Sequence, residues 1–126
     1  MAVSKNPVRG RSTGFRCNAE MMADLNVALA RDGVSPRRRS RWICRAVHKL
    51  FERDPSLDTV GAGEDREKYP IYTILVVDPE TDALIDRAFR ILRTVDPRHE
   101  GVASSVVRAA IRMGITKTPL EPDESL

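Results

Sequence analysis

The 126-residue sequence contains few aromatic residues, few cysteines and no long hydrophobic run. Aromatic residues make up only 5% of the chain, so a folded core must consist mainly of Leu, Ile, Val, Ala and Met. No apolar run approaches the roughly 20 residues that a membrane-spanning helix needs. The first residues also lack the apolar segment of a secretory signal. We therefore expect a soluble, cytoplasmic protein with no membrane partner.

Metal-binding and catalytic patterns are scarce as well. Cys17 and Cys44 show no metal-ligand spacing with each other or with the histidines, so we interpret them as small buried apolar residues of a reduced protein. The acidic triplet Asp78, Glu80 and Asp82 resembles a set of metal ligands, but acids in the first turn of a helix explain it better. We predict no enzyme, no metal site and no cofactor.

The charges are unevenly distributed along the chain. Residues 1–55 hold twelve Lys and Arg against five Asp and Glu, a net charge of +7. Residues 56–126 hold nine against thirteen, a net charge of −4, and the two halves add up to the +3 of the whole chain. A basic first half suggests a polyanionic partner, although an arginine-rich face is more often simply solvated.

The clearest β-strand signal is the run Ile-Tyr-Thr-Ile-Leu-Val-Val at residues 71–77, which is rich in β-branched and aromatic side chains. It stops at Asp78-Pro79-Glu80, a helix start with Asp as the N-cap and Pro at the first helical position. A weaker strand candidate, residues 11–17, runs into a similar helix start at Asn18. Because a lone strand leaves its backbone groups unpaired, we expect the two strands to pair.

These two strands open a pattern that occurs twice. Each is followed by an amphipathic helix, a polar turn and a second helix, expected at 19–32, 36–53, 79–94 and 102–114. A shift of 60 residues aligns Thr13 with Thr73, Phe15 with Leu75, Cys17 with Val77 and Asn18 with Asp78.

The repeat divides the chain into five segments. We expect a basic arm at 1–10, a first unit at 11–54, a linker at 55–69, a second unit at 70–115 and an acidic tail at 116–126. The arm is either a disordered terminus or a segment that touches phosphates. Since a unit of about fifty residues has a marginal core alone, we expect the two units to share one core.

This order of elements, with a second helix that opens on Ser, resembles the ribbon–helix–helix family, whose members include Arc and MetJ. The matching stretches are Phe15-Arg16-Cys17-Asn18 with Arg39–Ala46, and Leu75–Thr81 with Ala103–Ala110. Two units in one chain are similar to the tandem members of the family, among them the TraY-type accessory proteins of conjugative relaxosomes and the accessory protein that binds the enhancer beside T-DNA borders. The resemblance implies a mostly α fold with a short two-stranded antiparallel ribbon, in which the two units form an intramolecular pseudo-dimer.

The resemblance also implies that the ribbon enters the major groove of double-stranded DNA. Because side chains alternate along a strand, the expected outward set is Ser12, Gly14, Arg16, Tyr72, Ile74 and Val76. Arg16 can form two hydrogen bonds to guanine, the alternative being a solvated strand residue. The apolar side chains of the second strand suit thymine methyl groups, but such a row more often marks a contact with protein.

The run Arg37-Arg38-Arg39-Ser40-Arg41 is the strongest electrostatic signal. At a helix N-terminus the free backbone N–H groups favour a phosphate, and in the family the start of the second helix holds the DNA backbone. The alternative is a solvated helix start whose arginines pair with acids. The predicted phosphate contacts are Arg9, Arg11, Arg37, Arg38, Arg39, Ser40, Arg41, Arg98 and Ser104.

We therefore predict a double-stranded DNA-binding protein that acts as an accessory factor in conjugative or plasmid DNA transfer or as a transcriptional repressor. Further expected partners are other transfer or regulatory proteins and additional copies of the chain on DNA. The alternative is a protein–protein adaptor that keeps the fold without reading the groove. An antitoxin is a weaker possibility, because the tail after residue 115 is short for wrapping a toxin.

Overall fold

The computed structural model describes residues 11–61, 64, 67–95 and 101–116. The elements follow one another in the order β1 (Arg11–Cys17), α1 (Ala19–Arg31), a short 3-10 turn η2 (Pro36–Arg38), α2 (Arg39–Arg53), β2 (Ile71–Val77), α3 (Pro79–Val95) and α4 (Val102–Thr116). The predicted mostly helical fold with a short antiparallel ribbon is confirmed, and the element bounds lie close to those expected from the sequence. None of the described helices has the length and apolar character needed to cross a membrane.

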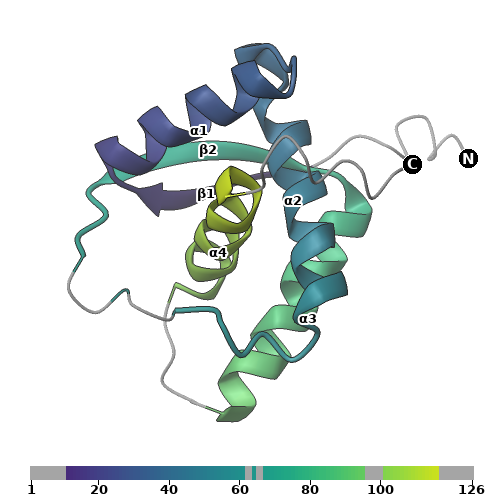
Figure 1. Ribbon diagram of the computed structural model, residues 1–126. Coiled ribbons are helices and arrows are strands. Elements are labelled where there is room, and N and C mark those ends of the chain that lie inside the picture. The colour runs from purple at the N-terminus through teal and green to yellow at the C-terminus, as the bar shows by residue number, and fades with distance from the viewer. Residues whose placement is uncertain (1–10, 62–63, 65–66, 96–100, 117–126) are drawn as a thin grey trace, which may run out of the picture.

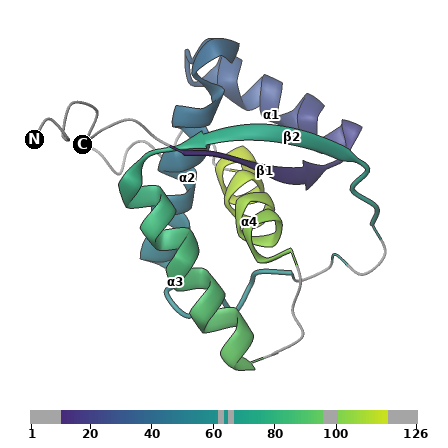
Figure 2. The ribbon, with the colours of Figure 1, turned by 180° about the vertical axis from the view of Figure 1, so that it is seen from behind.

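The two strands pair along their whole length. Arg11 lies opposite Val77, and Cys17 lies opposite Ile71, so the strands run antiparallel although they are far apart in the sequence. The ribbon lies across one side of the helices, with α2 and α4 packed against each other behind it (Figures 1 and 2). Because the strands are antiparallel, α1 and α3 lead away from opposite ends of the ribbon (Figure 1).

Burial alternates along both strands as the sequence predicts. Phe15 and Cys17 on β1 are buried, as are Thr73, Leu75 and Val77 on β2. These side chains meet the apolar faces of the helices, including the fully buried side chains of α1, α2 and α4. The ribbon therefore covers the core with one face and leaves the other face open to solvent.

The first helix of each unit begins at the residue that the sequence indicates. The side chain of Asn18 accepts a hydrogen bond from the backbone N–H of Met21 at 2.8 Å. The side chain of Asp78 accepts the equivalent bond from the backbone N–H of Thr81 at 2.7 Å. Each bond satisfies a donor that the helix itself leaves free, so both caps fix where the chain turns from strand to helix.

The segment predicted as a linker contributes to the core. The Asp54 carboxylate accepts hydrogen bonds from the backbone N–H groups of Asp58 and Thr59, which form a turn directly after α2. This turn carries Leu57 inward, where only 2% of its surface stays exposed. The polar pattern of this stretch hides that anchor, because a single leucine leaves no periodicity in the sequence.

Several predicted features lie outside the described residues. These are the basic arm with Arg9, the turn with Arg98, part of the linker and nearly all of the acidic tail.

Candidate nucleic-acid interface

The structure brings the six predicted groove residues together on the outer face of the ribbon. They form three rows across the strands, Ser12 opposite Val76, Gly14 opposite Ile74 and Arg16 opposite Tyr72. On β2, the exposed fractions of Tyr72, Ile74 and Val76 are 57%, 55% and 48%. The face is therefore open, with more apolar than polar side chains.

One end of this face is occupied by an arginine and an aromatic ring. The side chain of Tyr72 crosses the strand at Gly14, where an added Cβ would overlap the ring carbon Cζ and the hydroxyl oxygen. The guanidinium carbon of Arg16 lies 5.6 Å from the centroid of the same ring, and its Nη1 donates to the Pro70 carbonyl at 3.5 Å. The glycine thus makes room for a ring that supports Arg16 above the ribbon.

The backbone of Arg16 and the backbone of Val76 are held by the helices behind the ribbon. The N–H of Arg16 donates to the Ser104 hydroxyl at 3.0 Å, and the N–H of Val76 donates to the Ser40 hydroxyl at 3.0 Å. Each serine lies in the first turn of the second helix of the other unit, so the N-termini of α2 and α4 are attached to opposite edges of the ribbon.

The carbonyls of the same two strand residues are also bonded. Arg108 Nη1 donates to the carbonyl of Arg16 at 2.8 Å, and Cys44 Sγ donates to the carbonyl of Val76 at 3.6 Å. Cys44 and Arg108 each follow their serine by four residues, one helical turn. The two edges therefore have the same arrangement, built from a thiol on one side and a guanidinium group on the other.

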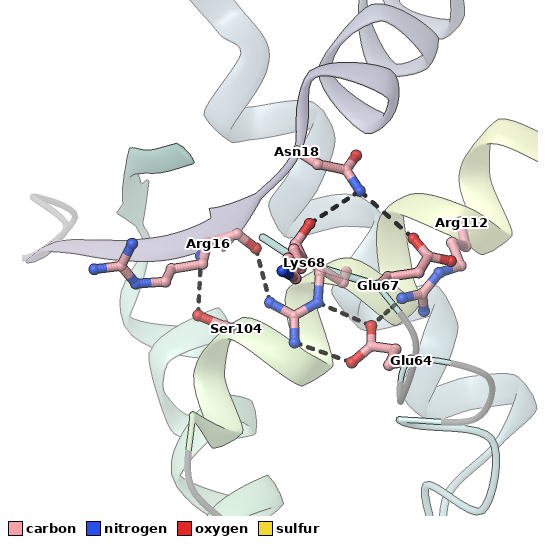
Figure 3. Close-up of polar contacts among 8 residues, drawn as sticks. Arg16, Asn18, Glu64, Glu67, Lys68, Ser104 and Arg112 are labelled. Atoms are coloured by element: carbon pink, nitrogen blue, oxygen red, sulfur yellow. Dashed lines mark hydrogen bonds and ion pairs between the residues drawn. The ribbon is translucent and has the colours of Figure 1, made fainter. Parts of the chain in front are cut away.

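Arg108 lies in a buried cluster that was not predicted from the sequence. Only 8% of its surface is exposed. Its Nε and Nη2 donate to the two carboxylate oxygens of Glu64 at 2.8 and 2.9 Å, and its guanidinium carbon lies 3.9 Å from the centroid of the Tyr69 ring. Arg112 contacts the same carboxylate, and the cluster adjoins the Ser104–Arg16 bond (Figure 3). The signal that the sequence offers is an arginine on the apolar face of the last helix.

The electrostatics of this cluster favour a charged Glu64. Burial by itself raises the pKa of Glu64, but the hydrogen bonds and charges of Arg108 and Arg112 outweigh it and hold the pKa below its ordinary value. The ionised carboxylate joins the segment before β2 to α4, and Arg108 extends the connection to the carbonyl of Arg16. This cluster therefore positions the strand that carries Arg16.

The predicted arginine cluster lies at the edge of the ribbon beside Val76. Arg37 and Arg38 are in η2, Arg39 and Arg41 begin α2, and all but the half-buried Arg39 are exposed. Within the described part of the chain, none of these four guanidinium groups forms an ion pair, and the first turn of α2 contains no acid. These arginines are therefore not paired with described acids, and three of them are open to solvent.

The other predicted phosphate contacts lie in different surroundings. Arg11 forms an ion pair of 2.5 Å with Asp82 in the first turn of α3. The hydroxyls of Ser40 and Ser104 accept bonds from strand N–H groups, but each keeps its own hydrogen as a donor. Acids occupy the first turns of α1 and α3, whereas the first turns of α2 and α4 contain none. An anion is therefore accommodated best at the two helices that flank the ribbon.

Comparison of the chain with models of protein families, with curated proteins and with solved structures finds no match in any of the three. Among the described residues, no three His, Cys, Asp or Glu side chains are grouped so that they could hold a metal ion.

Replacing either serine is expected to affect only the strand residue that it holds. In Ser40→Ala the amide hydrogen of Val76 should exchange faster with solvent, while that of Arg16 stays protected. In Ser104→Ala the amide hydrogen of Arg16 should exchange faster, while that of Val76 stays protected. Each variant should lose about 1 kcal/mol of unfolding free energy, the net contribution of one hydrogen bond. Amide exchange followed by NMR and denaturant unfolding measure the two effects. Equal exchange at both amides in both variants would contradict this arrangement, in which each serine holds the strand of the other unit.

Proposed function

We propose that the chain is a double-stranded DNA-binding protein whose two strand–helix–helix units form a ribbon–helix–helix pseudo-dimer within one polypeptide. The observation that carries the proposal is the crossed attachment of the ribbon, Ser104 to Arg16 and Ser40 to Val76. The register supports it, since Gly14 lies opposite Ile74, its own counterpart under the shift of 60 residues. A two-fold axis relating the units must pass through such a pair.

The outer face of the ribbon is the surface proposed to enter the major groove. That groove is wide enough for a two-stranded ribbon, and its base edges present acceptors to an arginine and methyl groups to apolar side chains. The exposed Arg16, Ile74 and Val76 offer both kinds of contact. The arginines at the start of α2 then lie at the edge of the ribbon, where a DNA backbone would pass.

The proposed biological role is that of an accessory factor in conjugative or plasmid DNA transfer, or of a transcriptional repressor. Both roles need the same duplex contacts, and they differ in the location of the bound site. Footprinting on the DNA that flanks the gene distinguishes them, because a repressor protects a promoter and a transfer factor protects the region of the transfer origin.

Duplex binding across a series of salt concentrations tests the proposal. Four to six phosphate contacts should give a plot of log affinity against log salt concentration with a slope of roughly −4 to −5, because each neutralised phosphate releases counterions. The variant Arg38→Ala should make the slope shallower by about one. Arg90→Ala, which removes an exposed charge from α3, is the matched control and should leave the slope unchanged. Absence of duplex binding at low salt would contradict the proposal.

A second candidate function is that of a protein–protein adaptor. The observation that favours it is the exposed row of Tyr72, Ile74 and Val76, because apolar side chains gathered on one face commonly mark a protein contact. An adaptor of this kind has no need of Arg16 and Arg38. The variant Arg16→Ala/Arg38→Ala should keep an adaptor's activity, whereas a DNA-binding protein should lose affinity for a duplex.

A further inference from the structure

The two-fold relation between the units shows which residues of the outer face occupy equivalent places. Under the shift of 60 residues Arg16 corresponds to Val76, and Ser12 corresponds to Tyr72. In a dimer of identical chains the two positions of each such pair would hold the same residue. In this chain the paired residues differ in charge, size and hydrogen-bonding capacity, so the two ends of the face offer different chemistry.

The end formed by Arg16 and Tyr72 is suited to a base edge that accepts hydrogen bonds. Arg16 is exposed, and its guanidinium group is supported by the Tyr72 ring and by the carbonyl of Pro70. A guanidinium group that is partly oriented in advance loses less freedom on binding. Its two parallel donors match the O6 and N7 atoms of guanine, the most frequent partner of arginine in the major groove.

The other end, formed by Ser12 and Val76, has no charged side chain in its row. Val76 and the central Ile74 are about half exposed, at 48% and 55%. Neither side chain can form a hydrogen bond to a base, but both can contact the C5-methyl group of thymine. The hydroxyl of Ser12 can serve as a donor or an acceptor and does not alter this preference.

The helix starts beside the two ends also differ in charge, and the arginines lie beside the end of the ribbon that has no charged side chain in its row. Ser40 attaches the start of α2 to the edge at Val76, and η2 and the first turn of α2 together hold four arginines. Ser104 attaches the start of α4 to the edge at Arg16, and the described part of that first turn holds no basic residue. Phosphate contacts add affinity without reading sequence. The arginine cluster thus stabilises binding where the ribbon itself has no charged contact to a base.

We propose that the chain recognises a non-palindromic duplex in one fixed orientation, with a guanine read by Arg16 in one half-site and a thymine methyl group contacted by Val76 in the other. The inference rests on the proposed DNA binding and specifies its ligand. A single copy suffices, because both half-sites are read by one chain. The orientation is set by the unequal ends of the ribbon, with the arginine cluster on the thymine side.

Selection of bound sequences from a pool of random duplexes, with the full chain, tests the inference. The expected motif has no inverted repeat, contains guanine in one half and contains thymine in the other. Replacing the selected thymines by deoxyuridine, which lacks only the methyl group, should weaken binding about fourfold per contacted methyl. The same replacement in the guanine half should have no effect.

Two variants assign the half-sites to residues. Arg16→Ala should reduce the discrimination for guanine by roughly 5- to 150-fold while the response to deoxyuridine persists. Val76→Ala should abolish the response to deoxyuridine and keep the guanine preference. In hydroxyl-radical footprints, Arg38→Ala should weaken protection only on the thymine side. Circular dichroism of each variant verifies that the fold is retained.

The possible failures are distinguishable from one another. A palindromic motif in which both halves respond alike, or duplex binding with no sequence preference, would overturn this inference and leave the proposed DNA binding standing. Absence of any duplex binding in the same pool would overturn both. If Arg16→Ala removed the response to deoxyuridine and Val76→Ala removed the guanine preference, the assignment of Arg16 and Val76 to the two halves would be wrong.

Discussion

The triple variant Arg37→Ala/Arg38→Ala/Arg41→Ala is expected to bind duplex DNA two to three orders of magnitude more weakly than the unmodified chain at about 0.1 M salt. Each phosphate contact contributes about 0.9 to the slope of log affinity against log salt, so loss of three contacts makes the slope shallower by about 2.7. The three side chains are exposed and form no ion pair with described residues, so their removal should leave the fold intact. Fluorescence anisotropy with a labelled duplex measures both quantities.

The matched control removes the same charge from another helix. Arg87, Arg90 and Arg93 are exposed on α3, which leads away from the ribbon (Figure 1). Their replacement by alanine changes the net charge of the protein equally, but it should change the salt slope by much less than the cluster variant does. If both triple variants weakened binding alike, the effect would come from overall charge, and the location of the phosphate contact at α2 would be wrong.

Replacing Glu64 by alanine is expected to lower the free energy of unfolding by about 3 to 5 kcal/mol, because removing one partner of a buried ion pair leaves the other uncompensated. Arg108 is almost fully buried and directs two hydrogen bonds at this carboxylate. The loss is a large share of the stability of a small domain, about 5 to 15 kcal/mol. Urea unfolding followed by circular dichroism measures it. Glu52→Ala, which removes an acid from an exposed position on α2, is the control and should change little.

The pH dependence of stability should identify the same carboxylate. Since the folded protein holds the pKa of Glu64 below its ordinary value of 4.5, the group stabilises the fold fully above that value. The contribution is lost as the pH falls through the lower pKa of the folded state. In Glu64→Gln the unfolding free energy should therefore fall less steeply below about pH 4.5 than in the unmodified chain. Parallel curves for the two proteins would show instead that folding leaves the pKa of Glu64 unchanged.

Replacing both members of the ion pair tests whether the loss in Glu64→Ala comes from an uncompensated Arg108. In Glu64→Ala/Arg108→Met the nearly fully buried guanidinium group is removed together with its carboxylate partner. Arg112 also loses that partner, but its side chain is only partly buried, so much of the stability lost in Glu64→Ala should return. A double variant as unstable as the single one would mean that Arg108 contributes mainly through its bond to the carbonyl of Arg16 and its contact with Tyr69.

Much of the fold and of the ribbon face was predictable, because the signals lie within a few residues of one another. Asn18 and Asp78 cap helices that begin directly after them, and alternation along each strand separates buried from exposed side chains. The caps, the alternation and the strand pairing were all predicted and are confirmed by the structure. The repeat predicted the one long-range contact, the pairing of the two strands, because each unit contributes one strand that needs a partner.

By itself the sequence determined the element order, the inner and outer faces of the ribbon and the arginine-rich start of α2, because propensity, periodicity and charge are local properties of a chain. Only the tertiary structure decided which polar groups meet. Ser104 and Arg108 reach Arg16 from 88 and 92 residues away, and Glu64 was hidden in a stretch that looked like a solvated linker. A buried polar group takes whichever partner the packing of distant segments delivers, and no spacing within one segment records that choice.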